Sequence, residues 1–236
     1  MLTLNGFVKG EVTDYKQWTD NEFSITVKAD IGPYVAGQFT KLALQDENGE
    51  WLRRAYSFVN SPNHALGRQC MEFLIIDVPN GGLSPKLAKV NIGDDIYVGL
   101  LSTGTAIGPF LSILGESDTQ QRFEKIILVH AVRTKQELVY QALIEKLLHQ
   151  YNGKLVYLPI VSREQHPGIM SGRIPQLLKD SSLMNAVKIS PNKKNSFFYL
   201  CGNPAMVHDT RDVLIELGFE KHLRRSPGHF SFENYW

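Results

Sequence analysis

Hydrophobic and polar residues alternate with a period of two over several short stretches in the first half of the chain. The alternating stretches are residues 23–27, 37–44, 54–59 and 71–76. This period is typical of strands with one buried face. Turn-forming residues separate the stretches, and the composition of residues 46–49 (Asp-Glu-Asn-Gly) predicts a hairpin turn. Short strands at regular spacing predict a small antiparallel β-barrel.

Near residue 98 the pattern changes to strands that alternate with helices. The expected strands are 125–130, 154–161 and 197–201, and the expected helices are 135–150, 174–179 and 204–217. The last helix has clear end signals, because Asn203 can cap it, Pro204 opens it and Gly218 ends it. Repeated strand–helix–strand units predict a parallel, doubly wound sheet that binds ligands at the carboxyl ends of its strands. We therefore expect two domains, an antiparallel β-barrel at 1–98 and an α/β domain at 99–236.

Composition and charge narrow the class of protein. The chain has 236 residues, 43% hydrophobic and 21% charged, which is ordinary for a soluble globular protein. The net charge of +1 does not favour nucleic-acid binding. Cys70 and Cys201 lie far apart in no metal-ligand spacing, so we expect no metal and a reducing compartment. With neither a signal peptide nor an apolar run of about 20 residues, we expect a cytoplasmic protein without a membrane span.

The strand around Arg54-Ala55-Tyr56-Ser57 carries unusual chemistry. A flat aromatic ring with a phosphate tail could stack on Tyr56, take a hydrogen bond from Ser57 and pair its phosphates with Arg54. The alternative is an edge strand whose arginine and tyrosine face water.

A second stretch, residues 80–87, places two glycines before Ser84 and Pro85. Ser84 could cap a short helix that Pro85 opens, and a helix start behind a glycine turn can bind an anion. Taken alone, this stretch favours a simple capped helix after a turn over an anion site.

The order Arg-x-Tyr-Ser resembles the flavin signature of the ferredoxin–NADP reductases, and residues 54–62 are most similar to the bacterial flavodoxin/ferredoxin–NADP reductases. The resemblance implies that Tyr56 packs on the isoalloxazine of FAD, Ser57 lies near its reactive nitrogen and Arg54 holds the pyrophosphate. Further FAD-binding positions are then Ala55, Leu74, Ile75, Ile76, Asp77, Gly82, Leu83 and Ser84.

Three loops of the second half match the same family in order: Thr-Gly-Thr-Ala-Ile-Gly-Pro at 103–109, Val-Ser-Arg-Glu at 161–164 and Cys-Gly-Asn-Pro at 201–204. Two arginines and a serine suit a phosphate monoester, although surface arginines are also common. By the resemblance, Thr105 borders both the flavin and the nicotinamide, and Cys201 lies beside the nicotinamide. The remaining implied NADP contacts are Arg133, Ser162, Arg163, Arg173 and Asp209.

The chain ends in Glu233-Asn234-Tyr235-Trp236. Two large rings at a chain end need something to pack on, and either a cofactor or the barrel would serve. By the resemblance, Tyr235 covers the isoalloxazine face opposite Tyr56, Trp236 packs on the FAD adenine, and Glu233 offers a proton route. The implied catalytic set is thus Ser57, Cys201, Glu233 and Tyr235. A basic stretch with Lys221, Arg224 and Arg225 suits a transient encounter with an acidic carrier, ferredoxin or flavodoxin.

We therefore expect a monomeric FAD enzyme that moves electrons between NADP(H) and ferredoxin or flavodoxin, by hydride transfer at flavin N5 and then one-electron steps. The alternatives are an NADPH reductase of free flavins, quinones or other small acceptors, and a flavin-binding module without turnover; a module would not need the paired arginines. One region departs from the family, because only residues 99–102 separate the barrel pattern from the Thr-Gly-Thr motif. Either the join between the domains is compressed or the sequence omits a segment.

Overall fold

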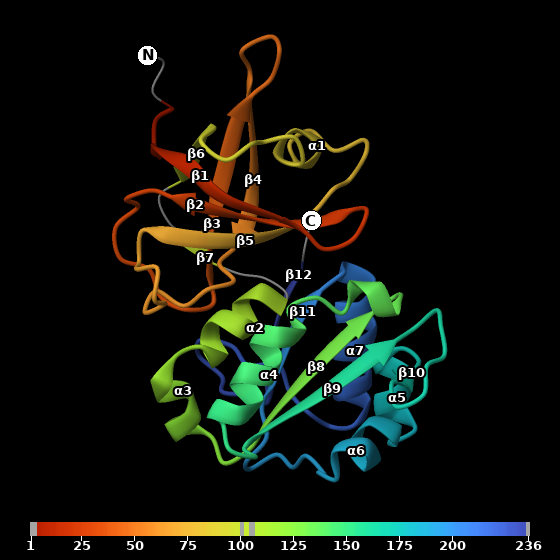
Figure 1. Ribbon diagram of the computed structural model, residues 1–236. Helices are drawn as coiled ribbons and strands as arrows, with labels where there is room; N and C mark the ends of the chain where they lie inside the picture. The colour runs from red at the N-terminus through yellow and green to blue at the C-terminus, as the bar shows by residue number, and fades with distance from the viewer. Residues whose placement is uncertain (1–3, 100–101, 104–106, 235–236) are drawn as a thin grey trace. The chain divides into compact units, whose positions relative to one another are not determined.

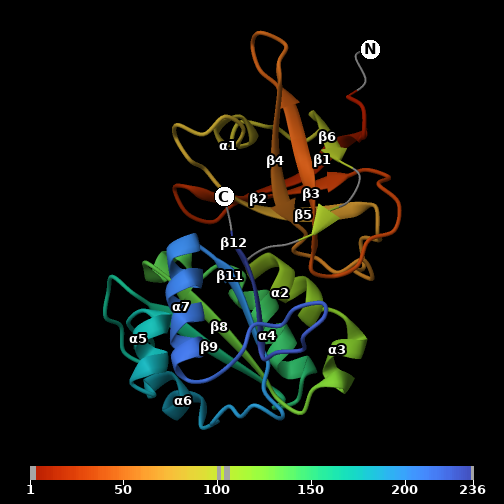
Figure 2. The same cartoon turned by 180° about the vertical axis from the view of Figure 1, so that it is seen from behind.

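A computed structural model of the chain describes residues 4–99, 102–103 and 107–234 (Figure 1). Figure 2 shows the same fold from behind. The chain divides into two compact units, residues 1–124 and residues 125–236. Among the residues that the structure describes, no helix has the length and apolar character needed to cross a membrane.

The first unit is built around an antiparallel sheet with the strand order β4-β3-β6-β1-β2-β5, and β7 pairs with β3 outside that order. The strands are β1 (Phe7–Gln17), β2 (Glu22–Lys28), β3 (Gln38–Gln45), β4 (Trp51–Ser57), β5 (Cys70–Ile76), β6 (Asp95–Gly99) and β7 (Ser102–Thr103). The two ends of the sheet meet, because Phe58 bridges to Phe73 and Val59 N–H donates to the carbonyl of Glu72 at 2.9 Å. This closure confirms the predicted antiparallel barrel.

Apolar side chains on alternate strand positions fill this barrel. Phe23, Ile25, Phe58 and Phe73 are fully buried in one cluster, and the rings of Phe58 and Phe73 lie 5.6 Å apart. The alternation seen in the sequence therefore marks the core face, as a half-buried strand requires. The predicted hairpin turn at 46–49 also forms: residues 46–50 join β3 to β4, and Asp46 N–H donates to the carbonyl of Glu50 at 2.9 Å.

Three helices complete the first unit: α1 (Ser84–Leu87), α2 (Ile107–Leu114) and α3 (Ser117–Arg122). The last two belong to it because they pack on the segment after β4. Ser112 Oγ donates to the carbonyl of Asn60 at 3.0 Å, and Glu116 accepts hydrogen bonds from Ser61 and from Asn63. The compact unit therefore runs past the predicted boundary at 98/99, and the division into FAD-binding and NADP-binding domains stays a prediction.

The second unit contains parallel strands with helices on both faces (Figures 1 and 2). Its elements are β8 (Ile126–Val132), η1 (Lys135–Glu137), α4 (Gln141–Gln150), β9 (Leu155–Val161), β10 (Met170–Ser171), α5 (Ile174–Lys179), α6 (Ser182–Val187), β11 (Phe198–Gly202), α7 (Pro204–Glu216) and β12 (Phe230–Asn234). One face of β9 packs through Ile160 on α5, α6 and α7, and Tyr157 reaches α4 through Gln141 at 2.9 Å. This arrangement confirms the doubly wound α/β prediction.

The parallel strands form two separate sheets within the described residues. One has the order β10-β9-β8, and the other pairs β11 with β12. The apolar run of β8 predicts a strand buried on both faces, yet Ile126, Ile127 and Val129 are only half-buried. A strand at the edge of a sheet keeps one side open, which accounts for this partial exposure.

The predicted helix over residues 135–150 is wrong in its first turn. A short 3₁₀ turn, η1, comes first, and α4 begins only at Gln141. Tyr140 between them has the left-handed φ of 59°, which ends one helical path before the next starts. The helix at the other end of the unit is as predicted, because the side chain of Asn203 accepts from Ala205 N–H at 3.0 Å and caps α7.

Candidate functional site

The Arg-x-Tyr-Ser strand is β4, and its residues differ in exposure. Arg54 and Ala55 are exposed, Tyr56 is half-buried and Ser57 is buried. Burial raises the pKa of Tyr56 to about 12, so its phenol stays neutral at physiological pH. Arg54 and Tyr56 are two residues apart, so both lie on the same face of the strand. An exposed arginine beside a half-buried ring is the arrangement that the ring-and-phosphate prediction requires.

Strand β7 brings the start of the Thr-Gly-Thr motif to the same sheet. Phe39 of β3 pairs with Ser57 on one side and with Ser102 on the other. Strand β3 therefore lies between the start of the motif and the Arg-x-Tyr-Ser strand. Thr105, which we predict to border the flavin and the nicotinamide, lies outside the described residues.

Asp77 directly follows β5, and its carboxylate is unusual. Its Oδ1 atom is fully covered and has no hydrogen-bond partner among the described residues. Burial and then the charge of Asp77 raise the pKa of Tyr15, and the same charge acts on Tyr56. A buried carboxylate oxygen without a donor is costly, and a bound group with N–H or O–H donors would satisfy it. An isoalloxazine against Tyr56 carries such donors, so the residues present fit a flavin.

The turn between Asp77 and α1 differs from its prediction. Ser84 does not cap the helix: Leu83 takes the cap position and makes no side-chain cap, and Ser84 is the first helical residue. The hydroxyl of Ser84 instead accepts from Val78 N–H at 3.1 Å, which pulls the turn closed. A side chain on Gly81 would lie 2.9 Å from the carbonyl of Val78 and 3.0 Å from Ser84 Oγ, so this tight turn needs glycine.

The other predicted FAD positions contribute in different ways. Gly82 has open space around it, because a Cβ there would meet only Leu52 at 3.8 Å. Leu83 and Ile75 are fully buried in the barrel core, so only their backbone groups can reach a ligand. Leu74 and Ile76 lie on the same strand, and β5 pairs along its whole length with β2. Whether any of them touches FAD stays a prediction.

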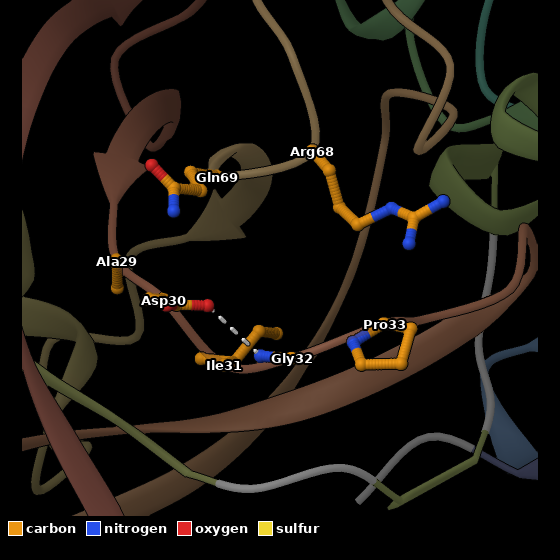
Figure 3. A pocket seen from close by; sticks show the side chains of 7 residues that line it. All are labelled: Ala29, Asp30, Ile31, Gly32, Pro33, Arg68 and Gln69. Atoms are coloured by element: carbon orange, nitrogen blue, oxygen red, sulfur yellow. Dashed lines mark hydrogen bonds between the residues drawn. The ribbon is translucent and has the colours of Figure 1, made fainter.

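A hollow of about 310 Å³ lies elsewhere on the first unit. Figure 3 shows it lined by residues 29–33 together with Arg68 and Gln69. Asp30 there accepts from the backbone N–H of Gly32 at 3.4 Å. None of the predicted site residues lines this hollow, so it is not the candidate site.

In the second unit, three predicted arginines follow the carboxyl ends of neighbouring strands. Arg133 follows β8, Arg163 follows β9 and Arg173 follows β10. The strand ladder continues into their loops, since Arg163 N–H donates to the carbonyl of Arg133 at 2.9 Å. Ser162 Oγ donates to the carbonyl of Val132 at 3.1 Å. The structure therefore brings these predicted NADP residues to one edge of the β10-β9-β8 sheet.

The three guanidinium groups are not equivalent. Arg133 is clamped by Glu137, which accepts from its Nε at 2.9 Å and its backbone N–H at 2.8 Å. No carboxylate among the described residues pairs with Arg163 or Arg173, and both side chains are exposed. Two free arginines beside a serine hydroxyl are suited to a phosphate, because a guanidinium matches phosphate oxygens in geometry and charge.

Cys201 and Glu233 lie side by side on paired strands. β11 and β12 run parallel with Cys201 opposite Glu233, and partial burial raises the pKa of the Glu233 carboxyl. Phe230 anchors β12, being fully buried against α7 residue Leu214. The chain end is thus held in the second unit as far as residue 234. Tyr235 and Trp236 lie outside the described residues.

Two functional candidates were missed from the sequence. Glu137 clamps Arg133, and Glu164 joins the loops that carry the arginines. Glu137 stands four residues after Arg133, the spacing at which a carboxylate reaches a guanidinium, so that signal was present. Glu164 gave no such signal, because Lys135, whose backbone N–H it accepts, lies in the neighbouring loop 29 residues away. Asp209 lies exposed on α7, and nothing in the structure assigns it a role.

Comparison with known proteins decides the family. The flavodoxin/ferredoxin–NADP reductase of Escherichia coli strain K12 is 43% identical over 250 residues, which covers 98% of this chain and 99% of that protein. The chain belongs to the flavodoxin/ferredoxin–NADP reductase family. The reductase of Buchnera aphidicola from Baizongia pistaciae is 40% identical over 253 residues, with 99% of this chain and 100% of that protein covered.

Two further comparisons agree with this family. Residues 100–212 match the family model of the oxidoreductase NAD-binding domain. A crystal structure of a ferredoxin NADP⁺ reductase from Neisseria gonorrhoeae, with bound FAD and NADP, superposes with a TM-score of 0.89 at 28% identity. It covers 98% of this chain, and this chain covers 99% of it.

The reductase alignments are also longer than this chain. They run over 250 and 253 positions, which is longer than the 236 residues of this chain. The two relatives therefore contain residues that have no counterpart here.

Proposed function

We propose that this chain is an FAD-dependent reductase that transfers electrons between NADP(H) and ferredoxin or flavodoxin. The observation that carries the proposal is its likeness to named flavodoxin/ferredoxin–NADP reductases over nearly its whole length. When bound, FAD supplies the chemistry that links a two-electron hydride donor to a one-electron acceptor. The protein supplies binding, orientation and electrostatics.

On the barrel, Tyr56 offers a ring face to the flavin. Arg54 offers the pyrophosphate a guanidinium that pairs with no carboxylate among the described residues. Ser57 offers a hydroxyl near the reacting edge, and Asp77 offers an acceptor, its Oδ1, to which no described residue donates. The backbone between Gly82 and Ser84 and the end of β5 complete the proposed FAD site. Residues 1–98 are then the FAD-binding part and residues 99–236 the NADP-binding part.

In the second unit, Arg163 and Arg173 would hold the 2′-phosphate that distinguishes NADP from NAD. Arg133 and Ser162 border the same loops. Cys201 and Glu233 lie beside one another, and a carboxyl with a raised pKa can exchange a proton near neutral pH more readily than an ordinary one. Thr105, Asp209, Tyr235 and Trp236 keep the roles that the family resemblance implies.

For the acceptor, the turn at residues 223–226 presents Arg224 and Arg225, both exposed, after Lys221. We infer that this basic turn meets an acidic carrier transiently, since complementary charge raises the association rate more than the affinity. We further infer a cytoplasmic protein that acts as a monomer.

The test is the choice of acceptor. Purified enzyme with NADPH is mixed in a stopped-flow apparatus with flavodoxin, ferredoxin, a quinone and free flavin in turn. The account predicts faster reduction of a protein carrier, a rate that falls with salt, and a further fall in the Arg224→Glu/Arg225→Glu variant but not in the exposed control Lys146→Glu. A quinone or free flavin reduced faster than either carrier would instead support a small-acceptor reductase.

A further inference from the structure

Glu164 makes hydrogen bonds that connect the three loops that carry Arg133, Arg163 and Arg173. Its carboxylate Oε2 accepts the backbone N–H of Lys135 at 2.9 Å, across from the neighbouring strand's loop. The same oxygen lies 2.8 Å from His166 Nε2 within its own loop. These contacts hold the pKa of Glu164 below its usual range, through the Lys135 backbone hydrogen bond first and His166 second, so the carboxylate is charged at neutral pH.

The contact with Lys135 acts on the loop that carries Arg133. Lys135 is the first residue of η1, and the cap residue Thr134 makes no side-chain hydrogen bond to the turn. The first N–H groups of a helical turn need outside acceptors. Glu164, in the loop after β9, supplies an acceptor for the N–H of Lys135 and thereby fixes η1. Glu137 of η1 in turn holds the guanidinium of Arg133.

The other contacts act on the loops of Arg163 and Arg173. The backbone carbonyl of Glu164 accepts from Ser171 Oγ at 3.0 Å, two residues before Arg173. Gly172 between them has a φ of 139°, and a Cβ there would press on Leu177 at 3.2 Å, so the path into α5 is tightly set. Arg163 precedes Glu164 directly and is tied by its own N–H to the carbonyl of Arg133.

We propose that Glu164 is the positioning residue of the 2′-phosphate site: it fixes three loops at once and so holds the arginines in a geometry that selects NADP over NAD. This inference rests on the proposed function. The carboxylate does not itself touch the phosphate, since like charges repel. It acts through the Lys135 N–H on the loop of Arg133 and through His166 on its own loop, which carries Arg163. The backbone carbonyl of Glu164, which every variant keeps, ties Ser171 and the loop of Arg173 to the other two.

The experiment measures binding of two probes to the purified full-length protein by calorimetry. Adenosine 2′,5′-bisphosphate carries the 2′-phosphate, and adenosine 5′-monophosphate lacks it. For Glu164→Ala we expect about tenfold weaker binding of the first probe and unchanged binding of the second. In steady-state kinetics the KM for NADPH rises about tenfold, while kcat and the kinetics with NADH stay unchanged.

Glu164→Gln is the conservative variant, because its amide oxygen can still accept the Lys135 N–H, and it should retain most of the affinity. The exposed control Glu145→Ala on α4 should change nothing. Thermal unfolding and circular dichroism show whether Glu164→Ala is folded.

A second pair of variants tests the same contact from the other side. Lys135→Pro removes the backbone N–H that Glu164 accepts. The turn stays possible, because proline is tolerated at the first position of a helical turn. Thr134 already has the extended backbone that a residue before proline favours, at φ −129° and ψ 157°. We expect Lys135→Pro to weaken the 2′-phosphate probe as Glu164→Ala does, Lys135→Ala to leave it nearly unchanged, and the double variant Glu164→Ala/Lys135→Pro to add little.

The opposite outcomes overturn the inference. Unchanged or tighter binding of the 2′-phosphate probe in Glu164→Ala would mean that the carboxylate does not position the site. An equal loss for both probes, or no rescue by Glu164→Gln, would mean a general role in folding the loops. If the unmodified protein did not prefer the 2′-phosphate probe, the proposed function would fail together with the inference.

Discussion

The unequal pairing of the three arginines makes a quantitative prediction about nucleotide selectivity. Arg163 and Arg173 have no carboxylate partner among the described residues, whereas Arg133 is held by Glu137 with its Nε 2.9 Å and a terminal nitrogen 2.8 Å from the carboxylate. A phosphate that approaches Arg133 must share a guanidinium that is already neutralised. Replacing Arg163 or Arg173 should therefore cost more than replacing Arg133.

The magnitude follows from the exposure of these side chains. Hydrogen bonds to charged groups contribute about 1.5–3 kcal/mol, and fully exposed ion pairs contribute about 0.2–1 kcal/mol. Two exposed arginines on one phosphate fall between these ranges, at about 1.4 kcal/mol each, which corresponds to about tenfold in affinity. For Arg133→Ala we expect only about two- to threefold.

The assay is the ratio of kcat/KM for NADPH to that for NADH in each alanine variant. Arg163→Ala and Arg173→Ala should each lower this ratio about tenfold by raising the KM for NADPH, with NADH kinetics unchanged. The reasoning would be refuted by three equal effects, by a larger effect of Arg133→Ala, or by losses that are the same for NADPH and NADH.

Three more predictions follow from individual residues. Asp77→Asn removes the charge of a half-buried carboxylate that acts on Tyr56, and it should raise the potential of the bound flavin by on the order of 30 mV, as a dye-linked titration would show; an unchanged potential would place the flavin away from Asp77. Gly81→Ala should lower the FAD content of the purified protein, because its Cβ would lie 2.9 Å from the carbonyl of Val78, and full FAD occupancy would contradict this. Burial lowers the pKa of His130 to about 4, so the unfolded chain binds the proton first as the pH falls below about 6.5. Stability in urea should drop by about 2 kcal/mol between pH 7 and pH 5, and an equal drop in His130→Gln would show that another group is responsible.

The sequence pattern was sufficient for elements whose signals are local. The barrel strands follow from alternation, and α7 follows from Asn203, Pro204 and Gly218 at its ends. The parallel strands follow from apolar runs between helices. What failed was set by tertiary contacts: η1 breaks away from α4 because Glu137 turns back to hold Arg133, and Ser84 closes the turn at Val78 instead of capping a helix.

Site residues could be predicted where they belong to a contiguous motif. They could not be predicted where their role depends on a hydrogen-bond partner that the fold supplies. The resemblance named the arginines of the second unit, yet their division into one clamped and two free groups depends on Glu137. The unsatisfied oxygen of Asp77 arises only when β5 ends beside Tyr56, and the bridging role of Glu164 arises only when β8 and β9 lie side by side. Strand β12 also gave no pattern, because it is defined by its pairing with β11.

The central claim is that this chain holds a flavin and reduces it with NADPH. The direct measurement is anaerobic stopped-flow absorbance of the purified protein at the flavin band, with NADPH and NADH compared at equal concentrations. The account predicts a yellow protein whose band is bleached by NADPH at least about tenfold faster than by NADH. A protein that retains no flavin when supplied with FAD, or a flavin bleached equally by both nucleotides, would contradict it.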